Sequence, residues 1–458
     1  MAEQSKVSLW RSIQDIRRDE LPMALLMFFY FFLVITSFWI LKPIKKGLFI
    51  EFYETSGFDL FAWHLEASQA ELIAKVMNMV IAFIAVTVFT LLARKLRRHQ
   101  LTYVFSGFFI AGYLAYSLIL DKPGDWTVWS FYFFGDLFST VMVATFFAFL
   151  NDSVSPGAAK RLYGLIGLGG TAGGAFGSMV VAGFVDTLSK PEWLWLCSLV
   201  AAVIIVLAMS AARKLPTRQE EQASAPEPET KKASEGNPAL EGAKLALRSR
   251  YLLSVAAIVG LYEMVSTIMD FQFTSTIIYY LDGEAIGAQF ARVFMITNFV
   301  AMGVQLFLTS LVMTRFGVGT ALLVLPCAAL LGSTGFMIAP ILLIGSALNT
   351  CDNGFSYSVN QSAKEVLYVP TTRDEKYKAK AFIDMFVQRF AKALAVGLSL
   401  IITLAFTGFE SLRWLSLVTI VILVLWILAV RYVGGQFRSV NEVAEEENEA
   451  GTEVEKVR

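Results

Sequence analysis

Long uncharged apolar stretches recur along the chain and are separated by short polar segments. A membrane-spanning helix needs about 20 predominantly apolar residues. The run Phe316–Cys351 is too long for one span, and Gly332, Gly335 and Pro340 predict a turn that divides it into two. Trp126–Leu150 and Tyr251–Leu281 predict two further spans that contain charged residues. The remaining uncharged stretches each predict one span, giving about twelve in all: Leu21–Leu41, Val76–Ala93, Leu101–Leu120, Leu162–Val185, Trp193–Ala212, Val293–Thr314, Ala393–Phe409 and Trp414–Val430.

The distribution of Lys and Arg predicts the orientation of these spans. Cytoplasmic loops of membrane proteins carry an excess of both residues. If the N-terminus is cytoplasmic, the cytoplasmic segments all carry Lys or Arg, whereas the outer loops hold few of either. We therefore expect both ends of the chain in the cytoplasm. The cytoplasmic segments would be Arg94–His99, Asn151–Arg161, Arg213–Arg250, Thr314–Gly319, Lys364–Lys380 and the tail from Arg431.

A polar segment lies between the sixth and seventh predicted spans. Pro216–Gly242 reads "PTRQEEQASAPEPETKKASEGNPALEG", which is typical of a flexible linker. It predicts two six-helix bundles, and an all-α membrane protein of this kind resembles the major facilitator superfamily in architecture. The expected domains are a cytoplasmic N-terminal segment (1–20), an N-terminal bundle (21–212), a linker (213–250), a C-terminal bundle (251–433) and an acidic cytoplasmic tail (434–458).

Charged residues occur inside four of the predicted spans. The first span ends in "FWILKPIKKGLFI", with Lys42, Lys45 and Lys46; the fourth has Asp136, the seventh Glu263 and Asp270, and the tenth Asp352. An ionisable residue at the bilayer centre costs at least about 2.5–3.5 kcal/mol, so it usually faces a protein interior or a water-filled cavity. In a facilitator-type bundle, helices 1, 4, 7 and 10 line the central cavity. The charges therefore fall on the helices that would line it.

The spacing of the cations places them on shared helix faces. Lys42, Lys45 and Lys46 follow an i, i+3, i+4 pattern, and Arg389 and Lys392 in the eleventh span are three apart. A cationic face at the outer part of a cavity helix suits an anionic solute, and Pro43 is expected to kink the helix beside Lys42. The alternative is that these side chains snorkel to the lipid headgroups. A separate alternative for Asp136 and Asp270 is a structural bridge to a buried lysine, and for Glu263 it is a position that faces water in a vestibule.

Other function classes receive little support from the residues. The formal net charge of zero argues against a polybasic nucleic-acid binder. The glycine run Gly167–Gly174 lacks the Lys-Ser/Thr of a phosphate loop, so it predicts close helix packing instead. With two histidines and no catalytic or metal-ligand spacing, we expect no enzyme activity, no cofactor and no metal. The three cysteines lie in predicted spans, which argues against a disulfide framework.

Three stretches resemble the ATP/ADP translocase family of plastids and intracellular bacteria. The first is "SAKEVLYVPTTRDEKYKAKAFIDMFVQRFAKAL" (Ser362–Leu394), which is similar to the family's charged cytoplasmic loop and its eleventh helix. The second is "DLFSTVMVATFFAFLNDSVSPGAAKRLYGLIGLGG" (Asp136–Gly170), and the third is the basic cluster that ends the first span. The chain departs from the family pattern at Thr274, Ser356 and Gln361, where charged residues are expected.

The resemblance implies exchange of ATP for ADP, or nucleotide–proton symport, by alternating access in a bacterial cytoplasmic membrane. The expected partners are the lipid bilayer and a small anionic solute, most simply a nucleotide, handled by a monomer. Alternatives are a proton-coupled transporter of another anionic metabolite and a sensor of the same fold that does not transport. The base of a nucleotide would stack on Phe38, Trp39, Phe271 or Phe273. The expected substrate-binding residues are Lys42, Lys45, Lys46, Asp136, Asp270, Lys378, Lys380, Arg389 and Lys392.

Overall fold

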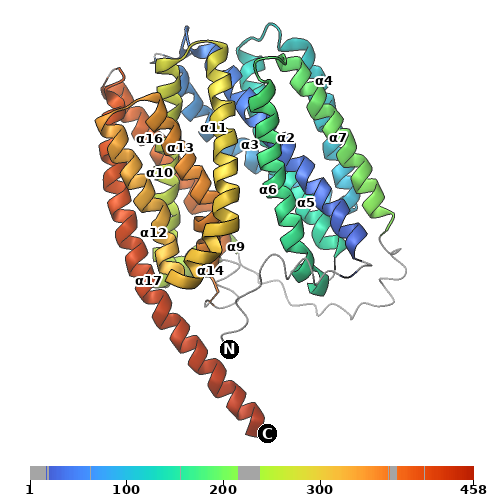
Figure 1. Ribbon diagram of the computed structural model, residues 1–458, viewed down its shortest axis with the longest axis vertical. Helices are drawn as coiled ribbons and strands as arrows, with labels where there is room; N and C mark the ends of the chain where they lie inside the picture. The colour runs from blue at the N-terminus through green and yellow to red at the C-terminus, as the bar shows by residue number, and fades with distance from the viewer. Residues whose placement is uncertain are drawn as a thin grey trace. The chain divides into compact units, whose positions relative to one another are not determined.

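The computed structural model is almost entirely helical (Figure 1). It describes residues 17, 20–61, 63–154, 156–214, 238–369, 371, 379–406 and 408–457. Ten helical segments in these ranges are long and apolar enough to cross a membrane. One of them, Glu284–Ile338, joins two helices at a kink, and the helical residues 342–366 form a further column. The described chain therefore has the twelve helical columns that the apolar pattern predicted.

The described chain forms two compact units. The first contains residues 1–232 and 281–298, and the second contains residues 233–280 and 299–458. The first unit holds six long helices and a small antiparallel hairpin in which Phe58 pairs with Leu65. Its elements are α2 (Leu21–Tyr53), β1 (Phe58–Leu60), β2 (Trp63–Leu65), α3 (Ala67–Lys95), α4 (Arg98–Ile119), α5 (Asp125–Ser153), α6 (Pro156–Phe184), α7 (Lys190–Ala212) and the first residues of α11 (Glu284–Gly303).

The second unit is built from helices that are interrupted by short π-helical turns. Such turns are rare and often mark functional sites. Its elements, beside the end of α11, are α9 (Pro238–Arg248), α10 (Arg250–Tyr280), η1 (Val304–Leu308), α12 (Thr309–Ile338), α13 (Leu342–Phe355), η2 (Ser356–Asn360), α14 (Gln361–Val366), α15 (Lys380–Phe382), η4 (Ile383–Val387), α16 (Gln388–Ala405) and α17 (Ser411–Val457).

Three glycines of α6 pack directly against the backbone of α2. Gly169, Gly173 and Gly177 are four residues apart, and a Cβ atom on each would meet the carbonyl oxygen of Phe28, Phe32 and Thr36 respectively. The hydroxyl of Thr36 also donates a hydrogen bond to the Gly173 carbonyl at 3.2 Å. Small residues at such spacing let two membrane helices approach closely. The glycine run is therefore a packing surface, as the sequence predicted.

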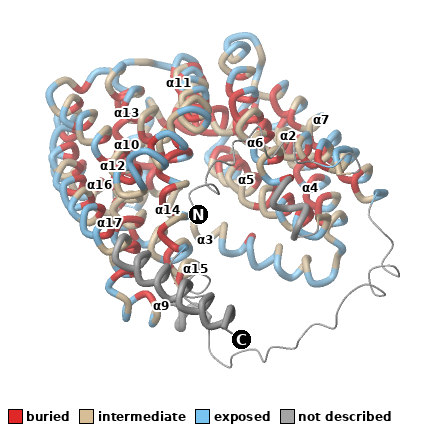
Figure 2. The backbone as a smooth tube through the Cα atoms, turned by 60° about the horizontal axis from the view of Figure 1, so that its bottom comes forward, coloured by how far each residue is buried: buried red, intermediate tan, exposed pale blue. Residues whose placement is uncertain are grey.

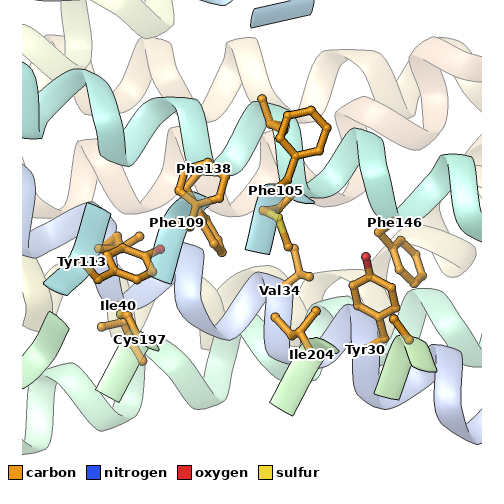
Figure 3. Packing of buried hydrophobic residues seen from close by; sticks show 14 of the residues in the cluster. Tyr30, Val34, Ile40, Phe105, Phe109, Tyr113, Phe138, Phe146, Cys197 and Ile204 are labelled. Carbon is orange, nitrogen blue, oxygen red and sulfur yellow. The ribbon is translucent and has the colours of Figure 1, made fainter. Parts of the chain in front are cut away.

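Aromatic and aliphatic side chains fill the interior of the first unit (Figure 3). Tyr30 of α2 lies edge-on to Phe146 of α5, with ring centroids 5.0 Å apart, and its hydroxyl lies 2.9 Å from that of Thr102. Phe109 of α4 makes a similar edge-on contact with Phe138 at 5.0 Å. Figure 2 shows buried and exposed positions on the helices of both units. Many of the exposed residues are large and apolar, as expected of helices that border lipid.

Several predicted boundaries are wrong. The eleventh span was expected from Ala393, but the described helix begins at α15 with Lys380, so Arg389 and Lys392 lie well inside it. The predicted turn near Pro340 is confirmed, because the backbone is extended from Ala339 to Ile341. The expected loop at Thr314–Gly319 is instead a kink within the helix at Gly317, where φ is 80°. The segment 213–250, expected to be a linker, includes α9.

Candidate functional site

The three lysines of the first span lie inside α2. The apolar run predicted an end near Leu41, but α2 continues through Pro43 to Tyr53. Lys45 and Lys46 are each 5% exposed, and Lys42 is half-buried. A snorkelling lysine would extend its ammonium toward the headgroups. The burial of Lys45 and Lys46 places these two side chains within the protein instead.

Lys45 forms an ion pair with Asp136 of α5. Its Nζ also lies 4.4 Å from the ring centroid of Tyr132, one turn earlier on the same helix, which is a cation–π distance. Gly135 provides the space, because a Cβ atom there would be 2.7 Å from Cδ of Lys45. Asp136 and Lys45, both candidate site residues in the sequence analysis, are thus in direct contact.

Lys46 shares the carboxylate of Glu71 with a second lysine. Its Nζ is 3.2 Å from Oε1 of Glu71, and Lys75, one turn further along α3, is 3.4 Å from the same oxygen. The hydroxyl of Tyr132 donates a third interaction to this oxygen at 3.1 Å. Glu71 is 1% exposed. A buried carboxylate is stable when it is paired and hydrogen-bonded, as Glu71 is here.

Aromatic rings surround the ammonium of Lys42. Its Nζ lies 4.5 Å from the ring centroid of Trp39, 4.7 Å from that of Phe294 and 5.9 Å from that of Phe38. Phe290, one turn before Phe294 on α11, lies 4.9 Å from Nζ of Lys46. Two of the rings proposed to stack on a base, Phe38 and Trp39, therefore lie beside a lysine proposed to bind phosphate.

Together these side chains form what we call the cation cluster. Among its six side chains, which α2, α3 and α5 contribute, four ammonium groups outnumber two carboxylates. Such an excess inside a membrane protein attracts anions and is costly without a function. The cluster consists of Lys42, Lys45, Lys46, Glu71, Lys75 and Asp136.

A separate cavity of about 390 Å³ in the first unit has the opposite character. Its wall includes Glu51, Asp121, Asp186 and Glu284 but only one lysine, Lys190. Lys190 is itself 2.6 Å from Oε2 of Glu51. Carboxylates would repel an anionic solute, so we place the candidate anion site at the cation cluster and not in this cavity.

In the second unit, charged side chains of α10, α13 and α16 make polar contacts with neighbouring helices. Nζ of Lys392 is 2.9 Å from Oε1 of Glu263, so Glu263 has a cationic partner where the sequence suggested water. Oδ1 of Asp270 accepts a hydrogen bond from Nδ2 of Asn349 at 3.3 Å. Oδ2 of Asp352 accepts one from the hydroxyl of Ser266 at 2.6 Å. Asp270 of α10 and Asp352 of α13 therefore each contact a side chain of the other's helix.

The other predicted site residues of this unit lie in different surroundings. Arg389 is half-buried in α16, one turn before Lys392. Phe271 and Phe273 are 2% and 0% exposed, so neither ring presents a face to solvent in this conformation. Lys380 forms an ion pair with Glu365. Lys378 lies outside the described residues.

Sequence reasoning missed several partners of these charges. Glu71 and Lys75 precede Val76, where the second span was expected to begin, and so were left outside it. The signal was present, since Glu66 and Gln69 form a capping box that starts α3 at Ala67. Asn349 and Ser266 carry no sequence signal of their own. Within the described ranges, no group of three or more His, Cys, Asp or Glu side chains is arranged to hold a metal ion.

Comparison with known proteins shows that the chain is similar to nucleotide carriers. Residues 327–437 match the TLC ATP/ADP transporter family. The chain is 24% identical over 360 residues to "ADP,ATP carrier protein 1, chloroplastic" of Arabidopsis thaliana, a match that covers 71% of this chain and 56% of that protein. It is 21% identical over 490 residues to "ADP,ATP carrier protein 1" of Rickettsia bellii, covering 94% and 96%. The chain thus spans little more than half of the plastid carrier.

Structural comparison gives the same fold. The nucleoside transporter NupG superposes with a TM-score of 0.62 and 12% identity, covering 91% of this chain and 99% of NupG. Residues 2–178 and 123–363 match the Major Facilitator Superfamily model, which together is most of the chain. This multi-pass membrane protein therefore belongs to the Major Facilitator Superfamily, and its residues 327–437 are similar to the TLC ATP/ADP transporters.

Proposed function

We propose that the protein exchanges ATP for ADP across a bacterial cytoplasmic membrane by alternating access, as a monomer with both termini in the cytoplasm. The observation that carries this proposal is the cation cluster, an excess of ammonium groups inside the bundle at the place where the sequence resembles nucleotide carriers. The similarity to proteins named ADP,ATP carriers supports the choice of solute.

Phosphate oxygens would take over the lysines from their present partners. Lys45 and Lys46 are held by Asp136 and Glu71, which keeps both ammonium groups paired when no anion is bound. A hydrogen bond to a charged group contributes about 1.5–3 kcal/mol, so each lysine that contacts a phosphate adds roughly ten- to hundredfold to affinity. When an anion binds the lysines, Asp136 and Glu71 would be released from them. Binding would therefore be coupled to a rearrangement of α5 and α3 against α2.

The rings around Lys42 provide a route to recognition of the base. The faces of Trp39 and Phe38 are now next to the Lys42 ammonium. If Lys42 swings toward a phosphate, these faces become available for stacking, which is worth about 1–3 kcal/mol per base. Phosphate binding and base binding would then depend on each other, and a solute with both parts would be preferred over either part alone.

The second unit carries further charged residues that we propose as contacts for the solute. Lys392 and Arg389 lie in α16, and Asp270 lies in α10, at positions that match charged residues of the family. The pairing of Lys392 with Glu263 repeats the arrangement of Lys45 with Asp136, a cation held ready by a carboxylate. Lys378 and Lys380 would meet the nucleotide near the cytoplasmic surface.

A second candidate is proton-coupled transport of another anionic metabolite. It is favoured by the neutral residues at positions where the family has charges. The hydroxyl of Thr274 donates to the carbonyl of Asp270 on its own helix at 2.8 Å, and that of Ser356 lies 2.5 Å from the Tyr262 hydroxyl. A sensor of the same fold that binds without transporting is the third.

A competition experiment on the purified protein tests the substrate class. Labelled ADP is displaced by unlabelled ADP, AMP, adenosine and pyrophosphate. We expect ADP to compete best, and Lys42→Ala to weaken ADP binding roughly ten- to hundredfold. Lys190→Ala, which removes a lysine outside the cation cluster, is the matched control. Equal competition by pyrophosphate would exclude a base site, and no displaceable ADP binding would reject a nucleotide substrate.

A further inference from the structure

Four oxygen-bearing side chains meet between α10 and α13, within the second unit. Ser266 and Asp270 are one turn apart on α10, and Asn349 and Asp352 are three residues apart on α13. The two pairs contact each other across the interface, Ser266 with Asp352 at 2.6 Å and Asn349 with Asp270 at 3.3 Å. Two adjacent contacts fix the register of the helices, so the four side chains form one oxygen cluster.

One oxygen of this cluster is buried without a hydrogen-bond donor. Nδ2 of Asn349 donates to Asp270, but its Oδ1 is buried and has no partner, and the residue is 1% exposed. Leaving a buried acceptor unsatisfied costs about 1–3 kcal/mol, and such groups usually have a donor, a water or an ion as partner. The neighbouring Asp352 is 2% exposed. The amide oxygen therefore lies where a cation would satisfy it.

We propose that the oxygen cluster formed by Ser266, Asp270, Asn349 and Asp352 binds a sodium ion. All its ligating atoms are hard oxygens from carboxylates, an amide and a hydroxyl, and it offers no nitrogen or sulfur that would select a transition metal. A calcium site uses six to eight oxygen ligands, so all six side-chain oxygens of these residues would have to converge on one calcium ion. Oδ2 of Asp352 and Oδ1 of Asp270 already accept hydrogen bonds within the cluster, which favours an ion with fewer ligands.

The backbone next to the cluster is suited to respond to occupancy. The π-helical turn η2 begins at Ser356, one turn after Asp352, and Ser356 shares a hydrogen bond with Tyr262 one turn before Ser266. Wider turns of this kind interrupt regular helix packing and occur often at functional sites. Drawing Asp352 toward a bound ion would move the start of this turn, and with it α14.

Sodium binding would also change the balance of charge in the second unit. One positive charge beside Asp270 and Asp352 offsets part of their negative charge, which favours entry of an anion near Lys392. This consequence rests on the proposed transport function, whereas the binding site itself does not. The two are therefore tested separately.

The first test measures radioactive sodium binding to the purified full-length protein in detergent. We expect saturable binding of one ion per chain, and a melting temperature that rises with NaCl but not with choline chloride or KCl at equal ionic strength. Absence of saturable sodium binding, or equal protection by all three salts, would overturn the proposal. So would protection by calcium without protection by sodium.

The second test uses matched variants in the same assays. Asn349→Ala and Ser266→Ala remove one ligand each and should raise the half-saturating sodium concentration at least tenfold. Asn353→Ala and Ser254→Ala should leave it unchanged, because these side chains bond only to backbone carbonyls of their own helices at 3.0 and 2.7 Å. If Asn349→Ala or Ser266→Ala fails to fold, the sodium-binding measurement on the wild-type protein still tests whether the site exists. Equal effects of all four variants would contradict the assignment.

The outcome for sodium is independent of the outcome for nucleotides. Sodium binding without nucleotide exchange would leave the site in place and reject only the proposed solute. Nucleotide exchange without any sodium binding would support the proposed solute and reject the sodium site. If both hold, nucleotide uptake should be faster with sodium than with choline outside, and Asn349→Ala should lose this difference.

Discussion

Replacing Glu71 with glutamine should destabilise the protein more than any other single change in the cation cluster. The carboxylate is 1% exposed and lies 3.2 Å from Lys46 and 3.4 Å from Lys75. Glutamine preserves the shape of the side chain and removes its charge. Breaking a buried ion pair by removing one partner costs about 3–5 kcal/mol, because an uncompensated charge stays behind. The folded-to-unfolded ratio should therefore fall by roughly two to four orders of magnitude.

The two lysines provide the controls for this prediction. Lys75→Ala should cost less, because Glu71 then keeps both Lys46 and the Tyr132 hydroxyl as partners. Glu71→Gln combined with Lys46→Met should recover most of the loss of the single glutamine variant, since replacing both charges by neutral groups is often close to neutral.

The assay is equilibrium unfolding of the purified variants in mixed micelles with increasing dodecyl sulfate, followed by tryptophan fluorescence. With Lys46→Met added as a single variant, the wild type, the two single variants and the double variant yield four free energies of unfolding, from which the coupling between Glu71 and Lys46 is obtained. The reasoning would be refuted if Glu71→Gln cost no more than Lys75→Ala. It would equally be refuted if the double variant were less stable than Glu71→Gln alone.

Three further changes test other parts of the account. Gly173→Ala should lower the free energy of unfolding by about 1–3 kcal/mol in the same assay, because the new Cβ would meet the Phe32 carbonyl. The control is Gly183→Ala on the same helix, whose Cβ meets nothing within 4 Å and which should be neutral or stabilising. Gly317→Ala should cost about 1 kcal/mol or more because φ is 80° there, and Gly303→Ala, in regular helix, should not. Asp136→Asn should slow nucleotide exchange in proteoliposomes more than it lowers the amount of folded protein, since it releases Lys45; an unchanged exchange rate would remove Asp136 from the mechanism.

The existence of the helices was predictable because it depends on local composition. Each long apolar stretch became a helix, and the charges on the first, fourth, seventh and tenth spans marked the helices that hold the buried polar contacts. The ends were less predictable where charged residues continue a helix. α2 runs on past Leu41 because Lys45 and Lys46 find partners on other helices, and hydropathy alone treats these lysines as the end of a span.

The contacts of the candidate site depend on tertiary structure and were only partly predictable. The spacing of Lys42, Lys45 and Lys46 indicated one face, and the structure confirms that all three lie within the helix that was expected to carry them. It did not indicate that Glu71 would hold Lys46, because residues 25 apart in sequence meet only when two helices pack. The pairing of Ser266 with Asp352, across 86 residues, is of the same kind.

The most direct test of the proposed exchange is uptake of labelled ATP into proteoliposomes preloaded with ADP or with buffer, at set membrane potentials. ATP and ADP differ by about one charge at neutral pH, and moving one charge through 100 mV is worth about 2.3 kcal/mol. The account predicts that internal ADP accelerates uptake, that a potential positive inside favours entry of ATP, and that a protonophore without a potential change has no effect. Uptake that ignores internal ADP but collapses with a protonophore would contradict exchange and favour proton-coupled transport.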